Sequence, residues 1–213
     1  EVNFPALLAM VAQTVPNMRI RFATSHPKDM NDDILRAIAT HSNICKHIHL
    51  PFQSGSNSVL KDMNRKYTRE WYLDRIRAIR EIVFVGFHNE SEEDYQQTLD
   101  LMKEVMFDSA FMFKYSERPG TMASRNLPDN VDEEVKGRRL QELIDMQVEI
   151  SHQSNLKDVG KVFEVLVEGV SKKKSDELFG RSSQNKVIVF PDNGAKVGEL
   201  VQVRVTECTP ATL

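Results

Sequence analysis

The stretch His49-Leu50-Pro51-Phe52-Gln53-Ser54-Gly55-Ser56 marks the point where the chain passes from an extended segment into a helix. Residues 44–50 alternate between apolar and polar side chains and predict a strand. Pro51 lacks the N–H that a central ladder needs, so the strand ends there. Gly55 permits a sharp turn or a close backbone approach, and Ser56 is placed to cap a short helix. The stretch therefore predicts a strand, a tight tip and a helix.

The tip of this strand is the first candidate for a binding site. In α/β folds, ligands bind at the carboxyl ends of parallel strands. Gln53 offers one acceptor and two donors, and Ser54 adds a hydroxyl group. A polar loop that only joins a strand to a helix explains the same residues, and the spacing alone favours that explanation.

Strand and helix patterns alternate through the first part of the chain. Extended patterns occupy residues 19–25, 44–50, 84–87 and 110–115, and helical patterns occupy residues 29–41, 57–63, 68–83 and 91–106. Such alternation is typical of parallel βαβ units. We therefore predict an α/β domain over residues 1–130.

The rest of the chain has a different pattern. A long polar helix is predicted over residues 131–155. Beyond it the hydrophobic period becomes two, and short extended runs are separated by turn residues such as Pro191 and Gly194. Residues 156–213 therefore predict a small all-β barrel.

The composition fits a soluble globular protein. The 213 residues are 40% hydrophobic and 28% charged, and the net charge is -3, which excludes a uniformly basic nucleic-acid-binding chain. From Leu156 onward, however, nine Lys or Arg residues face eight Asp or Glu residues. The two cysteines lie far apart in sequence and provide no disulfide framework, so we expect a reducing, cytoplasmic location. No apolar run is long enough to span a bilayer, and we expect no membrane partner.

Three sequence motifs resemble those of a known family. The stretch at residues 49–56, the run VLKDMNRKYT at 59–68 and the run FKYSERPGT at 113–121 together resemble the methylthiotransferases of the radical S-adenosylmethionine (SAM) superfamily. The likeness is greatest to the tRNA-modifying branch and runs along essentially the whole chain. It implies the C-terminal part of a radical-SAM partial barrel, which is TIM-like with parallel strands, followed by a TRAM domain, an oligonucleotide-binding-like (OB-like) barrel that binds tRNA.

The resemblance also implies an activity and its cofactors. Enzymes of this branch add a methylthio group to C2 of N6-isopentenyladenosine at tRNA position 37, beside the anticodon. The full-length enzymes use two [4Fe-4S] clusters and SAM, and each cluster takes three cysteines. Cys45 sits in a strand pattern and Cys208 lies near the end of the β domain, so we expect neither to ligate a cluster or a metal ion. The chain would then begin partway through the catalytic domain and be inactive alone.

The resemblance assigns candidate residues to the SAM and substrate pocket. The strand tips of such a barrel face the pocket, which makes the expected cofactor-binding residues Gln53, Ser25, Arg21, Gly86 and Glu90. Arg21 is equally explained as a structural ion-pair partner. Residues after or at the end of the last strand would contact the substrate, namely Lys114, Arg118 and Thr121. The apolar run at residues 111–113 is predicted to be core.

Within the β domain, the basic residues are concentrated in one part of the sequence. We expect the tRNA-binding residues there to be Lys172, Lys173, Lys174, Arg181, Asn185 and Lys186. A run of charge is usually a solvated loop, but in a domain whose relatives bind RNA the contact with phosphates is the better explanation. Aromatic residues are scarce, so this domain is predicted to recognise backbone and shape. Base specificity would then come from the barrel pocket.

Two other functions fit parts of the same pattern. The sister branch of the family modifies an aspartate of a ribosomal protein, but it usually carries histidine after the glutamine where this chain has Ser54. A non-catalytic RNA-binding module would keep only the β domain's activity.

One junction in the sequence is unusually short. The helical pattern through Ile79 and Val83 meets the strand pattern at Phe84 without the loop of about two to six residues that such a connection needs. By resemblance, relatives carry an additional segment here.

Overall fold

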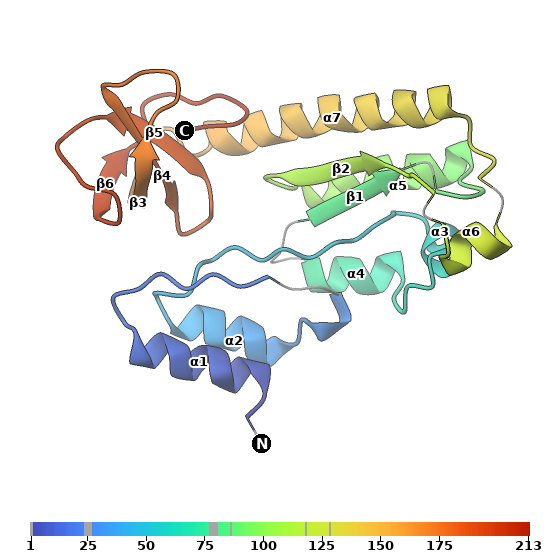
Figure 1. The fold of residues 1–213 in the computed structure, drawn as a ribbon, viewed down its shortest axis with the longest axis horizontal. Coiled ribbons are helices and arrows are strands. Elements are labelled where there is room, and N and C mark those ends of the chain that lie inside the picture. The colour runs from blue at the N-terminus through green and yellow to red at the C-terminus, as the bar shows by residue number, and fades with distance from the viewer. Residues whose placement is uncertain (1, 24–26, 77–80, 86, 118, 128) are drawn as a thin grey trace. The chain divides into compact units, whose positions relative to one another are not determined.

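A computed structural model describes the chain except for residues 1, 24–26, 77–80, 86, 118 and 128 (Figure 1). The chain forms two compact units. The first unit comprises Glu1–Ala23, Asn31–Ile48 and His152–Leu213, and the second comprises Thr24–Met30 and His49–Ser151. Among the helices of the described residues, none is both long enough and apolar enough to cross a membrane.

The first unit opens with two capped helices. Helix α1 (Phe4–Thr14) begins after Asn3, whose side chain accepts a hydrogen bond from the N–H of Ala6 at 3.0 Å. Helix α2 (Asp32–Thr40) begins after Asn31, whose side chain accepts from the N–H of Ile34 at 3.1 Å. Each cap satisfies a backbone donor that has no partner within its helix.

The two strands predicted at residues 19–25 and 44–50 are not formed as ladders in the described residues. They are extended segments joined by one isolated parallel bridge between Ile20 and Ile44. Polar side chains anchor these segments elsewhere: Asn43 Nδ2 donates to the carbonyls of Ala12 and Val15 at 3.0 and 3.1 Å. These hydrogen bonds attach the segment to the end of α1. The alternation of apolar and polar residues predicted a strand here, but it cannot show whether a partner strand is present.

The second unit holds a parallel two-stranded sheet and its helices. Strands β1 (Glu81–Val85) and β2 (Ala110–Lys114) pair in register from Glu81↔Ala110 to Val85↔Lys114. Helix α5 (Glu92–Val105) is the crossover that a parallel pair requires. The remaining elements are the short 3-10 helix η1 (Pro27–Asp29), α3 (Asn57–Asp62), α4 (Arg69–Ile76), α6 (Met122–Asn126) and most of α7 (Glu133–Leu156).

The boundaries in this unit differ from the sequence expectation at one place. Helix α4 ends at Ile76 and β1 begins at Glu81, whereas the sequence pattern extended the helix to residue 83. Pairing of residues 81–83 with β2 decides their conformation, and local helical periodicity cannot detect such a partner. In contrast, the predicted start of α5 is confirmed, because Ser91 and Asp94 form a reciprocal capping box.

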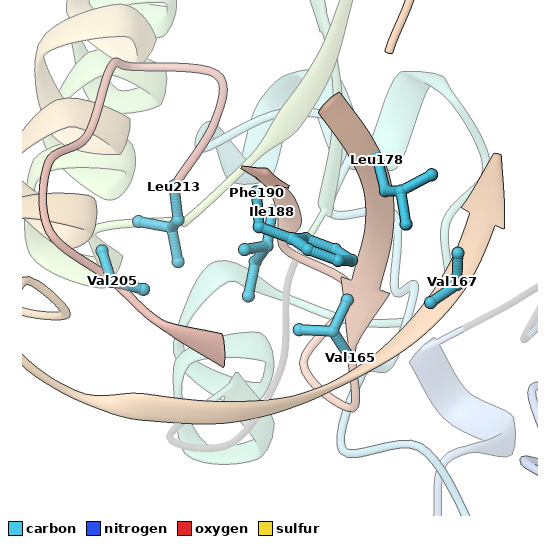
Figure 2. Close-up of a cluster of buried hydrophobic side chains, with 7 residues drawn as sticks. All are labelled: Val165, Val167, Leu178, Ile188, Phe190, Val205 and Leu213. Carbon is cyan, nitrogen blue, oxygen red and sulfur yellow. The ribbon is translucent and has the colours of Figure 1, made fainter. Parts of the chain in front are cut away.

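The first unit also contains the four-stranded antiparallel sheet of the β domain. Its strands are β3 (Val162–Val170), β4 (Glu177–Ser182), β5 (Val187–Pro191) and β6 (Leu200–Arg204), in the order β5-β4-β3-β6. The sheet curls around one hydrophobic core, in which the side chains point toward one another from several strands (Figure 2). The core residues are Val165, Val167, Leu178, Ile188, Phe190, Val205 and Leu213. This curled sheet fits the small β barrel that was predicted.

Candidate functional site

The tip residue Gln53 is buried and has an internal partner. Its side chain is only 6% exposed, and Oε1 accepts a hydrogen bond from Nη2 of Arg65 at 2.9 Å. Its φ of 71° lies in the left-handed region, which non-glycine residues rarely adopt. The surrounding structure holds the backbone of Gln53 in this strained conformation, and such residues are frequent at functional sites.

The three residues after Gln53 lock this tip to helix α5. The N–H of Gly55 donates to Oγ1 of Thr98 at 3.0 Å, and Ser54 Oγ lies 3.3 Å from the same atom. A Cβ on Gly55 would lie 2.6 Å from both the carbonyl carbon of Gln97 and the Cα of Thr98. The close backbone approach predicted for Gly55 is thus confirmed, and its partner is a helix of the same unit.

Asp94 completes the joint between the tip and α5. Ser58 Oγ donates to Asp94 Oδ1 at 2.6 Å, and Ser56 Oγ donates to the same oxygen. Burial of Asp94 raises its pKa, but the hydrogen bonds from Ser56 and Ser58 outweigh that effect and lower the pKa overall. The carboxylate therefore stays charged and serves both the cap of α5 and the tip.

A histidine and a tyrosine meet where β1 and β2 end. His88 Nε2 lies 2.8 Å from the hydroxyl of Tyr115, and the two rings pack edge to face with centroids 4.7 Å apart. His88 is fully buried, and its Nδ1 has no hydrogen-bond partner among the described residues. Burial raises the pKa of Tyr115, and the neighbouring Glu117 raises it further, so its hydroxyl is protonated. Sequence reasoning missed this pair, although Tyr115 directly follows β2 and His88 lies three residues after the end of β1.

Lys114 and a buried lysine share the acidic start of α7. Lys136 is 1% exposed, and its Nζ lies 2.7 Å from Asp129 Oδ2 and 2.8 Å from Glu133 Oε1. Lys114 Nζ lies 2.8 Å from the other oxygen of Glu133. Hydrogen bonds from Lys114 and then Lys136 lower the pKa of Glu133 to about 2. Lys114, a predicted substrate contact, is thus bound to Glu133 in this structure.

Glu90 forms a buried ion pair. Its Oε2 lies 2.9 Å from Nη1 of Arg139, and the two side chains are 0% and 4% exposed. The second guanidinium nitrogen of Arg139 contacts Glu92 at 3.0 Å. A charge removed from water needs such a partner, so this pair attaches the segment after β1 to α7. The structure thus turns the predicted cofactor contact Glu90 towards the protein interior.

The other predicted pocket residues have varied surroundings. Thr121 is exposed, and its Oγ1 accepts a hydrogen bond from the N–H of Ser124 at 3.2 Å, at the start of α6. Ser25, Gly86 and Arg118 lie outside the described residues. The alternative role considered for Arg21 is present in the structure, since its Nη2 lies 3.7 Å from Glu168 of β3.

The basic residues of the β domain fall into two groups. Lys172 and Lys173 are exposed in the loop between β3 and β4, and no carboxylate is paired with them among the described residues. Asn185 and Lys186 lie in the loop at the other end of β4, about 20 Å away for a strand of this length. The structure therefore does not gather all the predicted residues into one patch.

Three of these basic residues already bind carboxylates of the same unit. Nitrogen-to-oxygen distances are 2.8 Å for Lys174–Glu177, 3.1 Å for Arg181–Glu168 and 2.5 Å for Lys186–Asp158. An RNA phosphate would have to displace these carboxylates. Lys172 and Lys173 are therefore the two lysines of this predicted set that are exposed and have no paired carboxylate among the described residues.

The cysteines do not fit an iron–sulfur cluster. Cys45 is 2% exposed in the first unit, and Cys208 packs against the core of the β domain. A cluster in a radical-SAM enzyme takes several cysteine thiolates at one place, which two separated cysteines cannot supply. Within the part of the chain that the structure describes, no three His, Cys, Asp or Glu side chains are grouped to hold a metal ion.

Comparison with protein families assigns both parts of the chain. Residues 2–102 match the Radical SAM superfamily, and residues 156–213 match the TRAM domain. The chain is a radical SAM segment joined to a TRAM domain. Coproporphyrinogen III oxidase of Escherichia coli, a radical SAM enzyme, shares the fold with a TM-score of 0.50 at 15% identity, over 75% of this chain and 45% of that one.

Curated relatives match the radical SAM–TRAM chain along its whole length. The tRNA-2-methylthio-N(6)-dimethylallyladenosine synthase of Parabacteroides distasonis is 61% identical over 221 residues, covering 100% of this chain and 48% of the relative. Proteins of the same name from Azobacteroides pseudotrichonymphae and Porphyromonas gingivalis are 58% and 54% identical, over 99% and 100% of this chain and 49% and 48% of each relative. The chain thus spans about half the length of the curated relatives it matches.

The first of these alignments bears on the short junction near residue 83. It has 221 positions, whereas this chain has 213 residues, so at least 221 minus 213, or eight, positions of the relative have no counterpart here. This agrees with an additional segment in relatives, and its position between Ile79 and Phe84 stays a prediction.

Proposed function

We propose that this chain is the RNA-facing part of a tRNA methylthiotransferase. The complete enzyme would add a methylthio group to C2 of N6-isopentenyladenosine, also called N6-dimethylallyladenosine, at tRNA position 37. The observation that carries the proposal is the 61% identity, over the whole chain, to a relative named for that product. The pairing of a radical SAM segment with a TRAM domain supports it.

In the complete enzyme, the cofactors and the residues of this chain would have separate roles. Two [4Fe-4S] clusters and SAM would supply the radical chemistry, and cysteines outside this chain would hold the clusters. The chain's own contribution would be to shape and dry the pocket. The buried contact of Gly55 with Thr98 would hold the tip against α5, and the pair of His88 with Tyr115 would hold together the segments that follow β1 and β2.

The TRAM domain would bind the anticodon stem-loop through its phosphates. Lys172 and Lys173 extend from a hairpin loop, where two positive charges can approach an RNA backbone without losing an internal partner. Phosphate contacts position a protein on nucleic acid but carry no sequence information. Recognition of the isopentenylated adenosine would then depend on the radical SAM segment.

Deletion of the gene tests this proposal. The tRNA nucleosides and the ribosomal proteins of the deletion strain are compared with those of the parent by mass spectrometry. The proposal predicts loss of the 2-methylthio form, accumulation of N6-dimethylallyladenosine and unchanged ribosomal proteins. Loss of a methylthio group from a ribosomal-protein aspartate, with normal tRNA, would assign the chain to the sister branch. Unchanged tRNA and unchanged ribosomal proteins would leave only a non-catalytic RNA-binding function.

A further inference from the structure

The turn after strand β5 contains the only Asn-Gly pair of the sequence, Asn193-Gly194. Both residues are exposed, and the φ of Gly194 is 82°, which residues with a side chain rarely adopt. Asparagine is a thermally labile residue, because the backbone nitrogen that follows it can attack its side-chain amide. Glycine leaves that nitrogen unshielded, since it has no Cβ. The turn therefore presents an amide and a nucleophile next to each other.

Two hydrogen bonds arrange the groups of this turn. The N–H of Gly194 donates to Oδ1 of Asp192 at 2.8 Å, and the N–H of Ala195 donates to Oδ1 of Asn193 at 3.1 Å. Because the Asn193 oxygen bonds to the N–H two residues further on, its side chain lies back along the peptide bond that joins Asn193 to Gly194. Among the described residues beyond its chain neighbours, no atom lies within 4 Å of a Cβ placed on Gly194. Neighbouring side chains therefore leave this nitrogen open to reaction.

We propose that Asn193 is a site of self-catalysed deamidation. The carboxylate of Asp192 accepts the proton of the Gly194 nitrogen, and that nitrogen attacks the side-chain amide carbon of Asn193. The N–H of Ala195 stabilises the negative charge that develops on the Asn193 oxygen.

The bonds and protons of this reaction balance. A bond forms between the backbone nitrogen of Gly194 and Cγ of Asn193, and the bond from Cγ to Nδ2 breaks. Asp192 passes its proton to the departing nitrogen, which leaves as ammonia, and a five-membered succinimide ring remains. Water then opens the ring at either carbonyl, so the products at position 193 are aspartate and isoaspartate. Each product carries one negative charge that asparagine lacks.

The folded turn supplies two groups that an unfolded chain has to take from water. These groups are the proton acceptor and the donor to the developing oxyanion. A positioned general base contributes about 10²–10⁴-fold in an enclosed active site. Because Asp192 is exposed, we expect it to contribute about tenfold. The fold should therefore accelerate deamidation at this position.

The new charge lies beside the loop with the two exposed lysines. The N–H of Asp192 donates to the carbonyl of Asp176 at 2.8 Å, which attaches the turn to the loop that carries Lys172 and Lys173. A negative charge about 10 Å from a bound phosphate weakens its binding by about twofold in water, and salt reduces the effect. Deamidation would thus weaken RNA binding as the protein ages. This consequence rests on the proposed function, whereas the deamidation itself does not.

The experiment incubates the purified 213-residue chain near neutral pH. Peptide mass spectrometry follows the gain of about 1 Da at position 193 that accompanies replacement of the amide by a carboxylate. The rate is compared with those of the same chain unfolded in guanidinium chloride and of the folded variant Asp192→Asn, which keeps an acceptor for the Gly194 N–H but cannot take its proton. Circular dichroism verifies that the variant is folded. Asn57 is the internal control, because its Oδ1 accepts from the N–H of Arg69 at 2.7 Å, away from its own following peptide.

We expect folded wild type to deamidate at position 193 about ten times faster than Asp192→Asn and faster than the unfolded chain, with Asn57 intact. Equal rates in wild type and Asp192→Asn, or a folded chain that reacts no faster than the unfolded one, would overturn the proposal. Binding of tRNA at low salt then compares wild type with Asn193→Asp, which carries the charge of the product. We expect about twofold weaker binding by the variant. Equal binding would overturn the consequence alone, and absence of binding by both would count against the proposed function.

Discussion

Replacement of Gly55 by alanine tests how the tip at residues 53–56 is held in the fold. A Cβ at this position would lie 2.6 Å from Thr98 Cα and from the carbonyl carbon of Gln97. Ordinary carbon–carbon contacts lie at about 3.5–4.0 Å, so α5 would have to move away by about 1 Å. Both atoms belong to the helix backbone, and a rotamer change cannot relieve the overlap.

The cost of this movement follows from the interactions that it disrupts. Overpacking of a dense interior costs about 1–3 kcal/mol. The same movement stretches the hydrogen bond from Gly55 N–H to Thr98 and the contact of Ser54 with Thr98, which are worth about 1 kcal/mol each. We therefore expect a loss of about 4 kcal/mol in the free energy of unfolding, or a melting temperature lower by roughly 10 °C.

The single tryptophan gives a local probe for this measurement. Trp71 lies in α4, in the same compact unit as Gly55, so urea unfolding followed by its fluorescence reports on that unit. Gly137→Ala is the matched control, because no atom lies within 4 Å of a Cβ there and the residue is inside α7. The control should gain about 0.5–1 kcal/mol. A Gly55→Ala variant within about 1 kcal/mol of wild type would refute the proposed role of the joint.

Two further predictions concern charged groups. Arg139→Ala should destabilise the second unit by about 3–5 kcal/mol, because it leaves the buried Glu90 carboxylate without its cation. The control Arg138→Ala removes a side chain that is 52% exposed and should cost under about 1 kcal/mol. Urea unfolding followed by fluorescence compares the two variants, and equal losses of stability would contradict this explanation. Burial raises the pKa of Asp158, but the hydrogen bond from Lys186 helps to lower the pKa overall. The stability that this carboxylate contributes is therefore present above the unfolded-state pKa of about 3.9, and it is lost as the pH falls through the lower folded-state pKa. Asp158→Asn should therefore reduce the melting temperature at pH 7 and flatten its fall between about pH 5 and pH 3, and an unchanged pH profile would show that this carboxylate is not responsible.

Local signals predicted the parts of the fold that depend on neighbouring residues in sequence. The helical pattern at residues 91–106 was correct, and the cap that starts this helix needs only the side chain of Ser91 and the backbone N–H of Asp94, three residues away. The β domain was located correctly too, because the change to a hydrophobic period of two beyond the long helix is a pattern of residues close together in sequence. In contrast, the start of β1 depends on pairing with β2, a contact that no local pattern contains.

The candidate site was less predictable because its geometry depends on distant partners. Sequence alone placed Gln53 at a tip but could not show that Arg65 holds its side chain. The pairing of Lys186 with Asp158 likewise joins residues far apart in the chain. The apolar pattern of residues 111–113 identified a strand but predicted a core position, which is wrong for Phe111 and Phe113, because they are 62% and 48% exposed in the structure.

The measurement that tests the central claim most directly is the salt dependence of tRNA binding by the purified 213-residue chain. We expect binding that weakens as salt rises. The double variant Lys172→Glu/Lys173→Glu should weaken it further and reduce the slope of log affinity against log salt by roughly one for each phosphate that is no longer neutralised. Lys103→Glu, which changes an exposed lysine at the end of α5, should leave the slope unchanged. A chain that shows no salt-dependent binding to tRNA, or a double variant that binds as wild type does, would contradict the assignment of this chain as the RNA-facing part of a tRNA-modifying enzyme.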